Sequence, residues 1–168
     1  TNMCGIAGIL TFNTNEQLIK SLPQVLDTIK HRGPDDEGYA FFSKDTYSIN
    51  YGKDTPGNVR TSSLPYSPKS DANDHPSDSF LALGHRRLSI VDLSEQGHQP
   101  MCDETANYWM VFNGEIYNYL ELRTELEKEG LRFSSQSDSE VLLKAYVHWG
   151  EDCLNRFNGM WSFVIYNK

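Results

Sequence analysis

The sequence lacks the features that mark membrane, secreted and nucleic-acid-binding proteins. No apolar run is long enough to span a bilayer, and the stretch at residues 6–10 is far too short for a secretory leader. The formal net charge is −8 at pH 7, with no basic stripe. Such a chain is poorly matched to the phosphate backbone of nucleic acid. We therefore expect no membrane and no nucleic acid among its partners.

Cysteine and histidine are too few and too scattered for a disulfide framework or a zinc site. The three cysteines, Cys4, Cys102 and Cys153, are odd in number and include no CxxC pair, which fits a reducing cytoplasm. The five histidines, at positions 31, 75, 85, 98 and 148, show no metal-ligand spacing. The prediction is a cytoplasmic protein with no metal and no cofactor in this domain.

The composition is that of one globular domain with mixed secondary structure. The chain has 168 residues, 38% hydrophobic and 23% charged. Helices are expected after the caps Ser21, Asn118 and Ser137, the last helix closed by Gly150. Because strands and helices do not alternate strictly, the order favours an α+β layered fold with antiparallel sheets. The expected strands are residues 3–12, 39–42, 47–51, 80–84, 88–93, 108–112 and 160–166.

Two segments depart from this regular pattern. Residues 52–79 hold four of the seven prolines among Ser, Asp, Asn and Lys, so we expect a polar surface insertion with little regular structure. A lid or docking loop is the alternative. The last expected strand runs almost to residue 168, which leaves an unpaired sheet edge. That edge predicts an incomplete domain over residues 1–168, with self-association into a homodimer or instability as the consequence.

The N-terminal motif Met3-Cys4-Gly5-Ile6-Ala7-Gly8 places a cysteine directly after a methionine. If Met3 is the true start and is removed, Cys4 carries a thiol and a free α-amine on one carbon. An α-amine has an ordinary pKa of about 7.7–8.0, so it can take the thiol proton and generate the attacking thiolate. Taken alone, the motif more often marks a small buried hydrophobe in a strand.

The run Gly84-His85-Arg86-Arg87-Leu88-Ser89-Ile90-Val91-Asp92 puts two arginines at the mouth of an expected strand. Because successive side chains on a strand point to opposite faces, one arginine can face a site while the other faces solvent. A guanidinium suits bidentate capture of a carboxylate, although an arbitrary pair of arginines is more often a surface ion pair.

Two further clusters supply groups for a reacting amide and an ammonium. In Asn113-Gly114-Glu115, the Asn side chain and the Gly N–H form a natural pair of oxyanion donors, with an Asn-Gly hairpin turn as the alternative. Asp138, in the first turn of a helix, stabilises that helix or holds a ligand's ammonium group. With the thiol and the arginine, these groups describe a site for an α-amino acid that reacts at a side-chain carbonyl. Glutamine fits.

Five motifs in one order resemble the glutaminase domain of class II (N-terminal nucleophile) glutamine amidotransferases, most closely that of the glutamine-hydrolysing asparagine synthetases. The resemblance covers nearly the whole chain except residues 52–79. It implies a four-layer αββα sandwich with two stacked antiparallel sheets. The motifs are the N-terminal one, His31-Arg32-Gly33-Pro34-Asp35, the run from Gly84 to Asp92, Phe112-Asn113-Gly114-Glu115-Ile116-Tyr117-Asn118, and Ser137-Asp138-Ser139-Glu140.

The resemblance also implies a mechanism. Cys4 attacks the glutamine side-chain amide, forms a glutamyl thioester and releases ammonia, and water then releases glutamate. Ammonia is expected to pass to an ATP-dependent synthetase domain, absent from these 168 residues, that uses ATP and Mg to make asparagine from aspartate. The implied roles are an oxyanion hole at Asn113 and Gly114, a carboxylate site at Arg87 with Leu88, Ile90 and Val91 on the same wall, and an amino-group site at Gly114, Glu115 and Asp138.

Three alternatives stay open. Thr1 and Asn2 precede Met3, and while they persist Cys4 has no free amine, which would make the chain a non-catalytic glutamine-binding module. The length of the 52–79 insertion points toward a relative that amidates another carboxylate, such as a sugar acid. A generic thiol hydrolase with a Cys–His pair is the third, weakened because the residues named above account for the site without a histidine.

Overall fold

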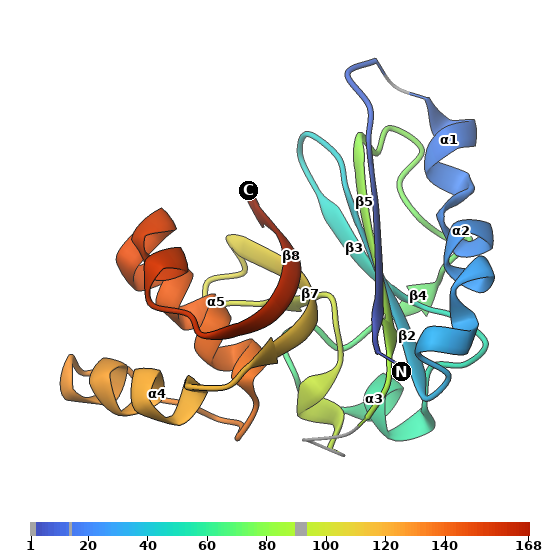
Figure 1. The fold of residues 1–168 in the computed structure, drawn as a ribbon. Helices are drawn as coiled ribbons and strands as arrows, with labels where there is room; N and C mark the ends of the chain where they lie inside the picture. The colour runs from blue at the N-terminus through green and yellow to red at the C-terminus, as the bar shows by residue number, and fades with distance from the viewer. Residues whose placement is uncertain (1–2, 14, 90–93) are drawn as a thin grey trace.

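The computed structural model describes residues 3–13, 15–89 and 94–168 as two β-sheets packed between two layers of helices (Figure 1). Helices α1 (Glu16–Lys20) and α2 (Leu22–Thr28) cover the outer face of the first sheet. Helices α4 (Tyr119–Lys128) and α5 (Asp138–Trp149) cover the second. This helix–sheet–sheet–helix order is the expected αββα sandwich. Within the described residues, no helix has the length and apolar character needed to cross a membrane.

The first sheet has five strands in the order β1-β5-β2-β3-β4, antiparallel except for the short parallel pair β3 and β4. The expected pairing of 39–42 with 47–51 is confirmed, whereas the run at 80–84 continues to Arg87 as one strand. The strand expected at 88–93 falls partly on residues outside the described part. The strands are β1 (Gly5–Leu10), β2 (Asp36–Phe42), β3 (Tyr47–Tyr51), β4 (Ser70–Asp71) and β5 (Leu81–Arg87).

Strand β5 divides its side chains between the two faces of this sheet. Leu83 packs in the core between the sheets, whereas Ala82 packs with the helix α2 side chains. Gly84 is on the α2 face too, where a Cβ would come within 2.5 Å of Leu26 Cδ1. Since strand side chains alternate, His85 and Arg87 follow Leu83 toward the second sheet, and Arg86 faces the α2 side.

The second sheet has the order β6-β7-β8, formed by β6 (Met101–Cys102), β7 (Tyr108–Ile116) and β8 (Gly159–Asn167). β7 and β8 are antiparallel over their whole length, from Tyr108 opposite Asn167 to Ile116 opposite Gly159. The strand expected at 108–112 therefore continues four residues further. The Asn113-Gly114 dipeptide lies inside a strand, so the hairpin-turn alternative is wrong.

Residues 52–79 are more closely integrated than a surface insertion. They form the helix α3 (Gly57–Thr61) and the strand β4, and Val59 and Tyr66 are buried. The Arg60 guanidinium donates to the carbonyls of Thr55 (3.0 Å) and Gly52 (2.7 Å), which ties the start of the segment to its helix. Two of its few apolar side chains, Val59 and Tyr66, therefore anchor the segment in the fold together with Arg60.

The helix ends follow the expected caps with two differences. The Ser137 hydroxyl accepts from Glu140 N, and Gly150 ends α5 with a positive φ of 61°. Glu140 reaches back to the backbone N–H groups of Ser134 and Ser135, not to Ser137. Ser21 precedes α2 and Asn118 precedes α4, but neither makes a side-chain cap bond. Short 3-10 helices η1 (Lys30–Arg32), η2 (Glu95–Gly97) and η3 (Gly150–Asn155) complete the fold.

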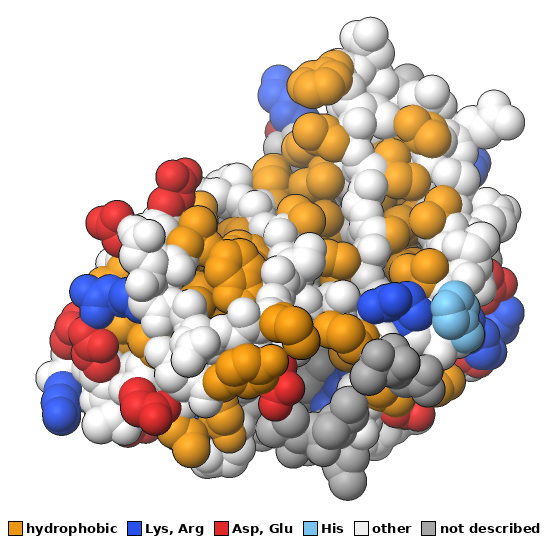
Figure 2. Space-filling model, in the orientation of Figure 1, with side chains coloured by type: hydrophobic (Ala, Val, Ile, Leu, Met, Phe, Trp, Pro, Cys, Tyr) orange, Lys and Arg blue, Asp and Glu red, His pale blue; other side chains and the backbone are white. Residues whose placement is uncertain are grey.

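Hydrophobic side chains gather over β1 and β8 on the face shown in Figure 2. β1 and β8 are the outermost strands in the order of their sheets. A strand that pairs on one side only leaves backbone groups and side chains accessible along its edge. The exposed apolar residues of the two strands and their ends are Leu10, Phe12, Met160, Trp161 and Val164.

An ion cluster around the buried Arg86 side chain joins the first sheet to α2. The Arg86 side chain is fully buried, and its guanidinium lies 2.9 Å from Asp27, 2.9 Å from Glu37 and 2.8 Å from Asp54. The expectation that one of the two arginines faces solvent is therefore wrong. Because the carboxylates come from α2, β2 and the turn after β3, Arg86 fixes three segments around one charge.

Replacing Arg86 is expected to cost far more stability than replacing an exposed lysine. Arg86→Met leaves the buried Glu37 carboxylate without its cation, a loss that typically costs about 3–5 kcal/mol. Lys20→Met removes the partner of exposed Glu16 and should leave the urea unfolding midpoint nearly unchanged. Equal midpoints for the two variants would show that the cluster contributes nothing to stability.

Candidate functional site

The Cys4 thiol lies against the end of β5. The Leu88 backbone N–H donates to Cys4 Sγ at 3.3 Å, and the Cys4 thiol donates to the Leu88 carbonyl at 3.7 Å. Arg32 Nε donates to the Cys4 carbonyl at 3.1 Å. Burial raises the pKa of the Cys4 thiol, while the Leu88 hydrogen bond and the Arg87 charge oppose that rise. The thiol is thus held in place beside a cation.

Arg87 is nearly as buried as Arg86 but belongs to the opposite face of β5. Its Nη1 donates to the Ser94 carbonyl at 2.8 Å. Gly97 makes room for the guanidinium, since a Cβ there would lie 2.1 Å from Nη2. Because the Arg87 charge acts on the Cys4 thiol, the two side chains share one site. A carboxylate that enters this site would meet a cation whose position is already fixed.

Among the described residues, no strand covers the edge of β7 at Gly114 that faces away from β8. The N–H groups of Phe112 and Ile116 point away from β8. They donate to Gln99 Oε1 (2.6 Å) and Asp138 Oδ2 (3.1 Å), respectively. Since backbone groups alternate along an antiparallel strand, the Gly114 N–H points to this same edge. β6 pairs no further along β7 than Met110. The Gly114 N–H is thereby available to an acceptor other than a neighbouring strand.

Asn113 and Gly114 both have local features typical of a functional position. Within the described part of the chain, the buried Asn113 Oδ1 has no hydrogen-bond partner. Buried polar atoms are normally satisfied, so each exception needs an explanation. A Cβ on Gly114 would lie 2.4 Å from the Met160 carbonyl, so the close approach of β8 requires glycine here.

Asp138 connects α5 to the same edge. Its carboxylate is buried, and burial raises its pKa, opposed by hydrogen bonds from Ile116 and Ser139 and reinforced by the nearby charge of Glu115. The Asp138 charge in turn raises the pKa of Cys4. A cation placed between Asp138 and Glu115 would relieve this repulsion.

The structure therefore brings most of the predicted residues together. Cys4, just before β1, interacts with Arg87 at the end of β5, with Leu88 after it and with Asp138 of α5. Asn113, Gly114 and Glu115 are on β7, whose Ile116 N–H bonds Asp138. Ile90 and Val91, predicted for the same wall, lie outside the described residues. No set of three His, Cys, Asp or Glu side chains is placed to share a metal ion within the ranges that the structure covers.

Three residues near the site had no predicted role there. Arg32 holds the Cys4 carbonyl, and its place in His31-Arg32-Gly33-Pro34-Asp35 was the only signal in the sequence. His85 and Gln99 both bond the backbone of Phe112. Among the described residues the Cys4 thiol bonds only to Leu88, and His85 faces Phe112, so the structure gives no support to a Cys–His pair.

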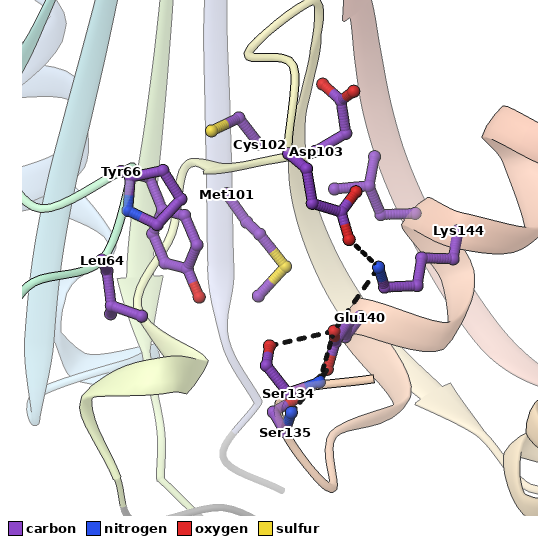
Figure 3. A pocket seen from close by; sticks show the side chains of 12 residues that line it. Leu64, Tyr66, Met101, Cys102, Asp103, Ser134, Ser135, Glu140 and Lys144 are labelled. Carbon is purple, nitrogen blue, oxygen red and sulfur yellow. Dashed lines mark hydrogen bonds and ion pairs between the residues drawn. The ribbon is translucent and has the colours of Figure 1, made fainter. Parts of the chain in front are cut away.

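A small cavity of about 80 Å³ opens between β6 and the start of α5 (Figure 3). None of the predicted site residues lines it. Glu140 accepts from the Ser134 and Ser135 hydroxyls, and Lys144 pairs with Glu104 and Glu140. Since these charged side chains already have partners, the cavity is a packing feature and the site remains the one around Cys4.

Comparison with known proteins agrees with this architecture. Asparagine synthetase 1 (glutamine-hydrolyzing) of Bacillus subtilis is 37% identical over 99% of this chain, and amidase chry2 of Gibberella zeae is 31% identical over 99%. The chain spans 21% of the length of each. The solved glutamine phosphoribosylpyrophosphate amidotransferase from B. subtilis superposes with a TM-score of 0.69 at 19% identity, covering 96% of this chain and 35% of that one. It supports the fold alone.

The family comparison is the most direct. The sequence pattern of the glutamine amidotransferase domain matches residues 3–52 and 67–168. The unmatched residues 53–66 fall within the segment at 52–79 that the sequence set apart. With two relatives above 30% identity over nearly the whole chain and a shared fold, the chain belongs to the glutamine amidotransferase domain family.

Proposed function

We propose that this domain hydrolyses the side-chain amide of glutamine, with Cys4 as nucleophile. The observation that carries the proposal is the placement of the Cys4 thiol beside the Arg87 cation, the Asp138 carboxylate and the free β7 edge at Gly114. Glutamine carries a carboxylate, an ammonium and an amide, and each has a group of matching chemistry here. Arg87 binds the carboxylate beside Leu88, and contact of Ile90 and Val91 with the substrate is part of the proposal that the sequence alone supports. Asp138 and Glu115 bind the ammonium.

The proposed reaction has two steps. The α-amine of processed Cys4 takes the thiol proton, and Sγ attacks the amide carbon while the oxyanion is held by the Asn113 side chain and the Gly114 N–H. The C–N bond breaks, the proton goes to the leaving nitrogen as ammonia, and a glutamyl thioester remains. Water then attacks the thioester and releases glutamate and the free thiol. No oxidant, metal or cofactor is needed in this domain.

The ammonia is proposed to serve a second, ATP-dependent domain. The names of the relatives support this, because one is a glutamine-hydrolyzing asparagine synthetase in which a stretch like this chain makes up 21% of the length. Asparagine made from aspartate is the leading product, with ATP and Mg in the synthetase domain. Another carboxylate, such as a sugar acid, is the second candidate, since the segment at residues 52–79 includes a stretch, 53–66, that the family pattern does not match.

The N-terminus decides between an enzyme and a binding module. Intact mass spectrometry of the chain produced from Met3, before and after a diazo-ketone analogue of glutamine, should show Met3 removed and one adduct. Cys4→Ala should show neither adduct nor glutamate release, whereas Cys102→Ala, which removes a buried thiol elsewhere, should keep both. A processed chain without an adduct would contradict the nucleophile assignment and favour the non-catalytic module.

Asn113→Ala should slow turnover of glutamine by about 10²–10³-fold with a small change in KM, because the lost donor acts on the transition state. Steady-state and single-turnover kinetics measure this directly. Asn107→Ala, which removes an exposed Asn side chain from the turn before β7, is the matched control and should keep the parent rate. An unchanged rate for Asn113→Ala would remove that residue from the oxyanion hole.

Substrate binding should weaken in acid because of Asp138. Burial raises the pKa of Asp138, so its carboxylate is present above that raised pKa and is lost as the pH falls through it. The kcat/KM of the parent should therefore have an acidic limb that Asp138→Asn removes. The variant should also lose about 10–100-fold in kcat/KM at neutral pH, the usual size for a charge-assisted hydrogen bond. Exposed Asp45→Asn should change neither.

A further inference from the structure

The backbone carbonyl and N–H of Phe112 are both hydrogen-bonded to side chains. His85 Nε2 lies 3.0 Å from the Phe112 carbonyl, and the Phe112 N–H donates to Gln99 Oε1 at 2.6 Å. All three residues are at most 4% exposed. A buried backbone pair held entirely by side chains, in the middle of a strand, is unusual because strands are normally paired by other strands.

The position of this clamp, formed by His85 and Gln99, explains why side chains are used. The β6 ladder stops at Met110, so at Phe112 this edge of β7 has no strand partner within the part of the chain that the structure describes. A longer β6 would satisfy Phe112 but would also cover the N–H of Gly114, two residues on. Gln99 and His85 satisfy Phe112 without extending a strand across Gly114. Asp138 takes the next N–H of this edge, at Ile116.

The clamp also links the two halves of the site. His85 is on β5, two residues before Arg87 and on the same face, and it touches β7 one residue before Asn113. Gln99 packs over β2, where a Cβ on Gly38 would lie 2.2 Å from the Gln99 carbonyl. A shift of either side chain would move β7 relative to the strand that carries Arg87.

The protonation of His85 suits a fixed donor. Burial lowers the pKa of His85 to about 3, so the ring is neutral in neutral solution and carries one N–H. The carbonyl of Phe112 accepts only, which places that hydrogen on Nε2. His85 therefore keeps one tautomer and takes no part in proton transfer at neutral pH.

We propose that His85 and Gln99 are positioning residues that hold β7 so that the Asn113 side chain and the Gly114 N–H stay aimed at the oxyanion. This inference rests on the proposed glutaminase function. It assigns the two residues chiefly to the chemical step, because the clamp bonds Phe112, next to Asn113, whereas Arg87 and Asp138 are carried by β5 and α5.

Paired variants separate the loss of each bond from the loss of the side chain. His85→Leu and Gln99→Met remove the donor and the acceptor, and each should lower kcat by about 10²-fold, the cost of a misplaced catalytic group, with little change in KM. His85→Gln and Gln99→Glu keep a donor and an acceptor and should recover most of the rate. His148→Leu, at an exposed histidine, is the control and should match the parent.

Two further measurements distinguish positioning from other roles. The pH profile of His85→Gln should keep the parent shape, whereas a lost limb would make His85 an acid or base and overturn the clamp. Amide hydrogen exchange should show Phe112 protected in the parent and exposed in Gln99→Met, while the N–H groups of β7 that face β8 stay protected. Parent-like kcat in His85→Leu and Gln99→Met would overturn the proposal with the glutaminase function intact.

The exchange measurement also separates the two hypotheses. A parent that never hydrolyses glutamine would overturn the proposed function and the catalytic role of the clamp together. Protection of Phe112 that disappears in Gln99→Met would then still establish the clamp as a structural feature of β7.

Discussion

The alternation of side chains along β5 is the constraint on which the rest of the structure depends. One face of this strand carries Leu83 into the core and then His85 and Arg87 toward the second sheet, and the other face buries Arg86 against α2. The space between the sheets thus changes from apolar to polar along one strand. Buried polar groups are costly without partners, and three of them are held by specific bonds: His85 to Phe112, His98 to Asp36, Arg87 to Ser94.

On β5 the buried polar groups need partners, whereas the proposed role of β7 needs one backbone N–H that is not paired with a strand. The structure solves this by ending β6 early and by satisfying the flanking N–H groups with Gln99 and Asp138. A free edge normally invites pairing with another strand. Here Gln99 bonds the N–H of Phe112 and Asp138 bonds the N–H of Ile116, so only the Gly114 N–H between them is left for another acceptor.

Much of the site could be predicted because its chemistry is local in the sequence. Cys4 after Met3, Asn113 beside Gly114, and Asp138 after its cap are each recognisable from neighbouring residues, and the order of the layers followed from the family resemblance. The partners of Arg86 could not be predicted, because Asp27 and Glu37 are 59 and 49 positions away from it. The extension of β7 past Phe112 depends on β8, and the burial of Val59 depends on packing, so neither has a local signal.

The electrostatics of the thiol explain why the proposed base has to be on Cys4 itself. Burial and the Asp138 charge disfavour the thiolate, and the Arg87 charge favours it. In the proposed complex, glutamine would place its ammonium on Asp138 and its carboxylate on Arg87, so both of these charges would be paired. Among the described residues the thiol bonds only to Leu88 backbone atoms, which cannot take a proton. The α-amine that removal of Met3 would release is the base we propose, and its ordinary pKa of about 7.7–8.0 lies where a general base for neutral pH should lie.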